Sequence, residues 1–140
     1  MILVDTSGLI LLYDRADRRR MAALTVVKAT GPRILSPFVL AEADYLLGRR
    51  FGRRAQMDLL EEAGRGVYQL EAFDIADVEI ARRVRDRYSD HDIGLTDASM
   101  VVLARRFDCL DVLTLDERHF RVLRGPGDRP FRILPADAAG

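Results

Sequence analysis

Short apolar segments alternate with longer amphipathic segments along the whole chain, and this alternation constrains the fold more than any other feature of the sequence. Continuous apolar runs are typical of strands buried on both faces of a parallel sheet. The predicted strands are residues 1–4, 33–36, 67–70, 111–115 and 132–134. Because parallel strands need crossover connections, usually helical, the pattern predicts an α/β fold, a three-layer α/β/α sandwich with a central, mainly parallel sheet.

Helices are predicted between these strands from the spacing of apolar residues and from breaker residues. The Gly31-Pro32 pair ends one helix, and Pro37 suits the first turn of the next. Gly48 and Gly52 are expected to bracket a turn at 49–51. The predicted helices are one that begins near Leu9, then residues 17–30, 37–47, a segment that ends at Ala63, residues 74–88 and residues 96–106. In segment 74–88 the apolar stripe is Ile75, Val78, Ala81, Val84 and Tyr88.

The composition agrees with one packed domain over residues 1–140. The chain is 49% hydrophobic and shows no internal repeat or low-complexity linker. Its single cysteine, Cys109, cannot form an internal disulfide, which is typical of proteins from reducing compartments. Asp5 interrupts the apolar start, so neither a signal peptide nor a membrane span is predicted. We expect a cytoplasmic protein.

The charge balance excludes a strong overall basic field, because 22 basic residues face 22 acidic ones. Only Lys28 among the basic residues is a lysine, and arginine is the side chain whose planar group matches phosphate and carboxylate. Arginine pairs at 49–50 and 53–54 flank Phe51, and further arginines lie within residues 82–87. These groups suit RNA phosphates with an aromatic ring nearby, or an ordinary solvated helix face.

Two aspartates follow predicted strands directly. Asp5 comes after the first strand and Asp116 after residues 111–115. Aspartate is also common at turns and helix caps, so either residue alone indicates little. The carboxyl ends of parallel strands are, however, where open α/β sheets build their sites. The pair together therefore indicates a functional edge.

Two further acids share helical stripes with apolar residues. Glu42 lies on a stripe with Val39 and Leu46, and Asp97 on a stripe with Met100. Both carboxylates are therefore expected to point toward the core side, where they need a proton, a cation or several donors. The alternatives are pairing with a helix N-terminus for Asp97 and an internal arginine pair for Glu42.

The four acids share one chemistry, that of hard oxygen ligands. With no histidine or cysteine at matching spacing, such a set selects Mg²⁺ or Mn²⁺ over zinc. A carboxylate site of this kind suits hydrolysis of a phosphodiester by a metal-activated water. One ion and two ions both remain open.

The acids also stand in segments that resemble a known family. These segments are Ile2-Leu3-Val4-Asp5-Thr6-Ser7, Leu40-Ala41-Glu42, Gly94-Leu95-Thr96-Asp97-Ala98-Ser99, and Leu113-Thr114-Leu115-Asp116 followed by Arg118-His119-Phe120. In order, spacing and total length the chain resembles PIN-domain ribonucleases, and among them the VapC-type toxins of type II toxin-antitoxin systems. Each segment is weak alone, but the four in sequence are specific.

The resemblance implies a single PIN-like nuclease domain in which Asp5, Glu42, Asp97 and Asp116 gather, bind Mg²⁺ or Mn²⁺ and cut RNA, leaving a 3′-hydroxyl. It implies a homodimer and a VapB-type antitoxin, which could use the arginine groups instead of RNA. Transfer RNA and ribosomal RNA are the family's usual targets. Thr6 occupies the place of a hydroxyl that family members use, although it could simply satisfy the turn backbone.

The roles of three further residues, Asp92, His91 and His119, remain open in the sequence. Asp92 is a candidate outer ligand, since relatives sometimes carry another acid in this region, but it is also an ordinary loop acid. His91 and His119 could act as general bases, yet metal-water chemistry needs none, so structural or surface roles are favoured.

Two other functions compete with the ribonuclease. The first is a nuclease-inactive binding module whose acidic pocket holds a partner's arginine. The second is phosphotransfer through an aspartyl phosphate at Asp5, which ranks last because Ser7 stands where a haloacid-dehalogenase-type phosphatase has its second aspartate.

Overall fold

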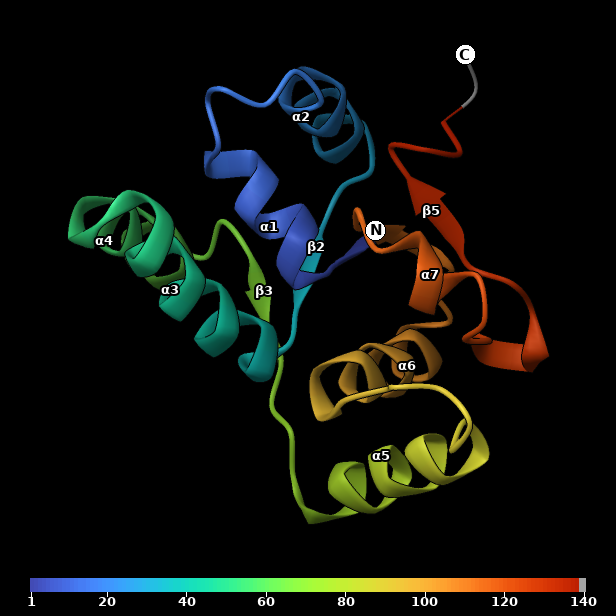
Figure 1. Cartoon of the computed structure of the whole chain (residues 1–140). Helices are drawn as coiled ribbons and strands as arrows, with labels where there is room; N and C mark the ends of the chain where they lie inside the picture. The colour runs from blue at the N-terminus through green and yellow to red at the C-terminus, as the bar shows by residue number, and fades with distance from the viewer. Residues whose placement is uncertain (139–140) are drawn as a thin grey trace.

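Five parallel strands form the centre of the computed structural model, which describes residues 1–138 (Figure 1). The strands are β1 (Ile2–Val4), β2 (Arg33–Leu35), β3 (Gln69–Leu70), β4 (Asp111–Leu113) and β5 (Arg132–Leu134). They pair in the order β3-β2-β1-β4-β5, and every pairing is parallel. The side chains of β1 are 0% exposed, as expected for a strand covered on both faces. The predicted parallel sheet is thereby confirmed.

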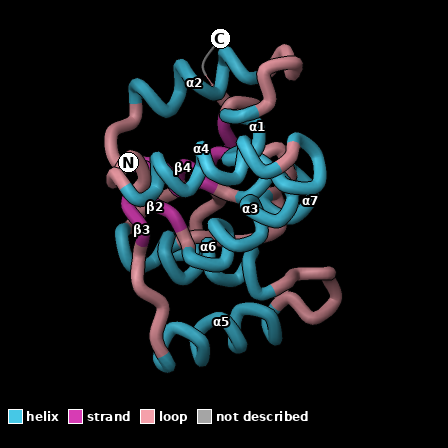
Figure 2. Tube along the Cα trace, turned by 90° about the vertical axis from the view of Figure 1, so that its left-hand side faces the viewer, coloured by secondary structure: helices cyan, strands magenta, loops and turns pink. Residues whose placement is uncertain are grey.

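Helices cover both faces of the sheet. They are α1 (Thr6–Tyr13), α2 (Arg20–Ala29), α3 (Pro37–Phe51), α4 (Arg53–Gly64), α5 (Ile75–Arg87), α6 (Leu95–Phe107) and α7 (Glu117–Phe120), with a short 3₁₀ turn at Pro126–Asp128. Figure 2 shows the strands between α2 above and α5 below. Helices α3 and α4 pack on each other, as do α5 and α6. This is the expected three-layer α/β/α arrangement.

The strand order contains one reversal, and it positions the functional edge. The chain moves outward from β1 through β2 to β3, then returns to the other side of β1 with β4 and β5. The reversal lies between β1 and β4, and in open α/β sheets ligands bind beside the carboxyl ends of strands at such a point. Asp5 follows β1 directly, whereas Asp116 lies three residues after β4, because this strand ends at Leu113 and not at Leu115 as predicted. Two of the predicted acids therefore flank the reversal.

Two helices differ from the prediction at their starts. The first helix begins at Thr6 rather than near Leu9, because β1 passes directly into α1 and the Asp5 carbonyl already accepts from the Leu9 amide. The helix predicted over 17–30 begins at Arg20, since Asp17 forms a turn that accepts from the Arg19 backbone.

The turn predicted at 49–51 is wrong. Helix α3 continues through Gly48 and ends at Phe51, where Gly52 takes a positive φ of 90°. Gly48 serves packing instead: a Cβ there would lie 2.3 Å from the Gln56 side-chain nitrogen. That nitrogen donates to the Asp44 carbonyl at 2.9 Å and joins α4 to α3.

The apolar stripe predicted for segment 74–88 is buried only in its second half. Ala81, Val84 and Tyr88 are buried, whereas Ile75 is 90% exposed and Val78 is 50% exposed. The first half of the predicted stripe therefore faces solvent, although α5 packs against α6. Among the described residues, no helix is both long enough and apolar enough to cross a membrane.

A glycine in α1 sets the distance between this helix and β4. A Cβ on Gly8 would lie 2.2 Å from the Leu113 carbonyl oxygen, which accepts from the Asp5 amide at 3.0 Å. We expect Gly8→Ala to lower the free energy of unfolding by about 1–3 kcal/mol, because the strand must move. Urea denaturation measures this. Gly64→Ala is the control, since a Cβ there meets nothing within 4 Å; equal losses in both variants would refute the packing role.

Candidate active site

One cavity at the carboxyl edge of the sheet brings the four predicted acids together. Its volume is about 320 Å³, and Asp5, Glu42, Asp97 and Asp116 all line it, together with Thr6. Asp5 and Asp116 come from the ends of the two central strands, and the other two acids come from α3 and α6. Residues separated by more than a hundred positions thus share one concave, strongly anionic site.

Asp5 is the most buried of these acids, with 4% of its surface exposed. The Thr114 hydroxyl donates to its Oδ2 at 2.8 Å. Burial raises the pKa of Asp5 to about 7, the nearby charges of Asp97 and Asp116 add to the rise, and the Thr114 hydrogen bond opposes it. Near neutral pH, a small change in the surroundings of this carboxyl therefore decides whether it is charged.

Thr114 also fixes Asp116. Its hydroxyl oxygen accepts from the Asp116 amide at 2.9 Å and lies 3.1 Å from the Ser7 hydroxyl. Ser7 in turn accepts from the Leu115 amide at 2.9 Å, which joins α1 to the end of β4. The Asp116 carboxylate accepts from the His119 amide at 3.0 Å and caps α7. A network of side chains therefore holds both strand-end acids in place.

Asp97 lies in the first turn of α6 and faces His119. The His119 Nδ1 atom is 3.1 Å from Asp97 Oδ2 and 3.0 Å from Asp116 Oδ2. Both contacts are close, but neither has the angle of a hydrogen bond, and both ring nitrogens are buried. Burial raises the pKa of Asp97, while His119 opposes the rise and Asp116 and Glu42 add to it.

Glu42 is exposed, so the prediction that it points toward the core is wrong. The fully buried row of α3 is Val39, Ala43 and Leu47, each 0% exposed, and Glu42 stands beside that row at the rim of the cavity. The Thr96 hydroxyl lies 3.5 Å from its Oε2, in donating position. Helical spacing thus identified the side of α3 that faces the cavity, but it did not identify which row of side chains on that side is buried.

Thr6 lies at the start of α1 with 6% of its surface exposed. Its hydroxyl has no hydrogen-bond partner within residues 1–138, so the alternative that it satisfies the turn backbone finds no support. A buried hydroxyl without a partner is costly unless a ligand completes it. Asp97, Asp116 and His119 offer ligand atoms that lie within 4.8 Å of one another, and Asp5 lines the same cavity. Because most of these atoms are carboxylate oxygens, the site fits a hard divalent cation such as Mg²⁺ or Mn²⁺.

Two of the residues whose roles the sequence left open lie outside this cavity. Asp92 and His91 are exposed and line a different cavity beside α5, with Arg82 and Arg85. His119 and Thr114, by contrast, belong to the site although sequence reasoning favoured other roles for the first and passed over the second. The available signals were the three-residue step from Asp116 to His119 and a hydroxyl in an otherwise apolar strand.

The comparisons with known proteins agree with this geometry. Residues 2–125 match the family model described as the PIN domain. The chain therefore belongs to the PIN-domain family. It is 36% identical over 135 residues to the ribonuclease VapC26 of Mycobacterium tuberculosis, an alignment that covers 96% of this chain and 100% of that protein. The resemblance to VapC-type ribonucleases found in the sequence is confirmed.

Solved structures share the fold. VapC20 of Mycobacterium tuberculosis, described as a sarcin–ricin loop cleaving toxin, superposes with a TM-score of 0.77 at 25% identity, covering 85% of this chain and 92% of that one. VapBC2 of Rickettsia felis, solved with a promoter DNA fragment, gives a TM-score of 0.68 at 14% identity and covers 95% and 98%. The predicted PIN-like architecture is confirmed.

The raised pKa of Asp5 makes stability depend on pH when no metal is bound. Between the unperturbed value of 3.8 and about 7 the folded state holds a proton that the unfolded state has released. Stability is therefore greatest at low pH in this window and falls as pH rises through about 7. We expect Asp5→Asn to remove this fall, so that at pH 8 the variant is more stable than the wild type, by on the order of a few kcal/mol.

Chemical denaturation with a chelator present, at pH 5 and at pH 8, measures the effect. Asp92→Asn is the matched control, because Asp92 is exposed and lies outside the site. A pH dependence in Asp5→Asn identical to that of the wild type would show that the buried carboxyl carries no such cost.

Proposed function

We propose that this chain is a metal-dependent endoribonuclease that acts as the toxin of a toxin-antitoxin pair. The observation that carries the proposal is the meeting of four carboxylates around one cavity, at the sheet reversal of a chain from the PIN-domain family. Phosphodiester hydrolysis needs charge neutralised on phosphate and a strong nucleophile at neutral pH. A cluster of acids can meet both needs only with a cation.

Asp5, Asp97 and Asp116 would hold the ion, with Glu42 at the rim of the same cavity. Mg²⁺, or Mn²⁺ in its place, would when bound supply an activated water and neutralise phosphate charge. Thr114 orients Asp5 through its hydrogen bond, so that little reorganisation is needed when the site is filled. Thr6 offers its free hydroxyl to substrate or to water.

His119 has a positioning role in this proposal. Its imidazole lies against Asp97 and Asp116 and limits how far these two carboxylates can turn. Asp116 is further restrained because its carboxylate accepts from the His119 amide. Metal-ligating carboxylates commonly depend on such supporting contacts for their orientation.

The substrate we propose is RNA, with transfer RNA or ribosomal RNA as the target class; the similar protein VapC20 is described as cleaving the sarcin–ricin loop. We also propose that the chain acts in the cytoplasm as one nuclease domain, forms a homodimer, and is inhibited by a VapB-type antitoxin. Similar solved proteins include a VapBC pair. Because the net charge of the chain is zero, RNA binding must come from local groups.

We expect Asp5→Asn and Asp97→Asn each to reduce RNA cleavage about a hundredfold or more, because the amide keeps the shape of the side chain but loses its negative charge. The assay follows cleavage of total RNA with Mg²⁺ or Mn²⁺, and sequencing of the cut ends identifies the target. Circular dichroism checks that the fold persists. Asp92→Asn is the control and should cleave normally.

Calorimetric titration with Mn²⁺ separates the ribonuclease from a binding module. We expect the wild type to bind the ion and Asp97→Asn to bind it much more weakly. No binding at millimolar Mn²⁺, together with tight binding of an arginine-rich peptide, would establish a nuclease-inactive module. Undiminished cleavage in both asparagine variants would remove the catalytic assignment of these acids.

A further inference from the structure

The cavity that holds the four acids continues along a groove between α1 and α3. On α3 it is lined by residues four apart, Glu42, Leu46 and Arg50. At the helical rise of 1.5 Å per residue, Glu42 and Arg50 are separated by about 12 Å along the helix axis. On the other side the lining runs from Thr6, at the start of α1, to Asp14, the residue that follows α1. One groove therefore connects the acidic site with an arginine at the far end of α3.

Arg50 is held in a fixed orientation there. Its Nη2 atom donates to Asp14 Oδ2 at 3.1 Å, and its guanidinium carbon lies 4.9 Å from the centre of the Phe51 ring. The Asp14 side chain is only 12% exposed, whereas that of Arg50 is 53% exposed. A buried anion on one side and an aromatic ring on the other thus fix the plane of a guanidinium that stays open to solvent.

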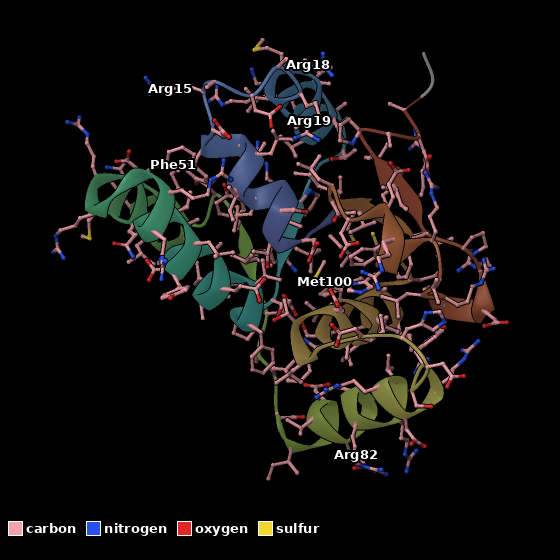
Figure 3. The ribbon with its side chains drawn as sticks, in the orientation of Figure 1. Arg15, Arg18, Arg19, Phe51, Arg82 and Met100 are labelled. Carbon is pink, nitrogen blue, oxygen red and sulfur yellow. The ribbon has the colours of Figure 1, made fainter. Side chains whose placement is uncertain are left out.

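Arg50 also keeps donors available. Arginine has five N–H donors, and within residues 1–138 those of Arg50 make one hydrogen bond, the one to Asp14. The other arginine in the groove, Arg19, is already occupied, because its Nε and Nη2 both donate to Asp17 at 3.0 and 2.8 Å. Figure 3 labels Phe51 and Arg19 on the two sides of the C-terminal end of α1. Of the two arginines, Arg50 keeps more of its donors free for a ligand.

The order of groups along the groove fits a nucleotide chain. At one end are carboxylates suited to a metal and the scissile phosphate, and in the middle is an apolar floor of Ile10, Leu11 and Leu46. At the other end is a guanidinium, the group whose planar fork matches phosphate. One or two nucleotides over the apolar floor would bring a flanking phosphate to Arg50.

We propose that Arg50 binds a backbone phosphate of the RNA one or two nucleotides from the one that is cut, and that Asp14 and Phe51 position its guanidinium. This inference rests on the proposed ribonuclease function and assigns part of its substrate site. With a bound cation neutralising part of the acidic cluster, Arg50 would give a chain without net positive charge one local contact to the RNA backbone.

The test is binding of a short single-stranded RNA, measured by fluorescence anisotropy in the cleavage-deficient Asp97→Asn background. We expect Arg50→Ala to raise the Kd roughly tenfold and to reduce the salt dependence, as log Kd against log salt concentration, by about 0.7. Arg50→Gln keeps the stem and a donor to Asp14 while losing the charge, so it should weaken RNA binding similarly even if Arg50→Ala unfolds. Arg54→Ala is the control, since Arg54 is exposed on α4 and does not line the groove.

The RNA affinities of the Arg50 and Arg54 variants decide whether Arg50 binds a phosphate. Weaker RNA binding in both Arg50 variants but not in Arg54→Ala supports the proposal, even if the wild type fails to cleave RNA, in which case the nuclease assignment alone falls. Equal losses at Arg50 and Arg54 overturn it, because they indicate diffuse electrostatic attraction. Unchanged RNA binding with lost affinity for a polyglutamate peptide also overturns it, and assigns Arg50 to an acidic protein partner.

Discussion

The Thr114 hydroxyl joins the ends of the two central strands, and the geometry of the site depends on it. It donates to the Asp5 carboxylate and accepts from the Asp116 amide, and Thr114 itself is 1% exposed, so water does not compete for these bonds. The strand order puts β1 and β4 side by side at the only reversal among the described strands. A single buried hydroxyl therefore holds Asp5 and Asp116 close together. These two acids are also the residues that directly precede α1 and α7.

Holding these acids together is costly for the protein by itself. Asp5 is buried and its pKa is raised to about 7, and Asp97 has a raised pKa for the same main reason, its burial. Burying like charges together is unfavourable, and a bound cation would remove this unfavourable energy. The same arrangement therefore lowers the stability of the metal-free protein and raises its affinity for a metal. His119, which lies beside Asp97, opposes the rise in the pKa of that carboxyl.

Much of the fold was predictable because strands and helices leave periodic patterns in a sequence. Asp5 and Asp116 were predictable for a related reason, since strand ends can be located and parallel strands align their ends. The partners of these acids were not, because Thr114 and His119 act through contacts between elements that spacing along the chain does not encode. Glu42 shows a finer limit: helical spacing identified the side of α3 that faces the cavity, but the row of Val39, Ala43 and Leu47 is the one that packs against the core. Gly48 was taken for a helix end because close packing and chain reversal both favour glycine.

The central claim is that the carboxylates around the Thr114 network form a metal site. Crystals grown with Mn²⁺ and measured at a wavelength where manganese scatters anomalously test it most directly. The account predicts an anomalous peak within the cavity, in contact with Asp5, Asp97 or Asp116, that disappears in Asp97→Asn crystals. An empty cavity at saturating Mn²⁺, or a peak found only elsewhere on the protein, would contradict the account.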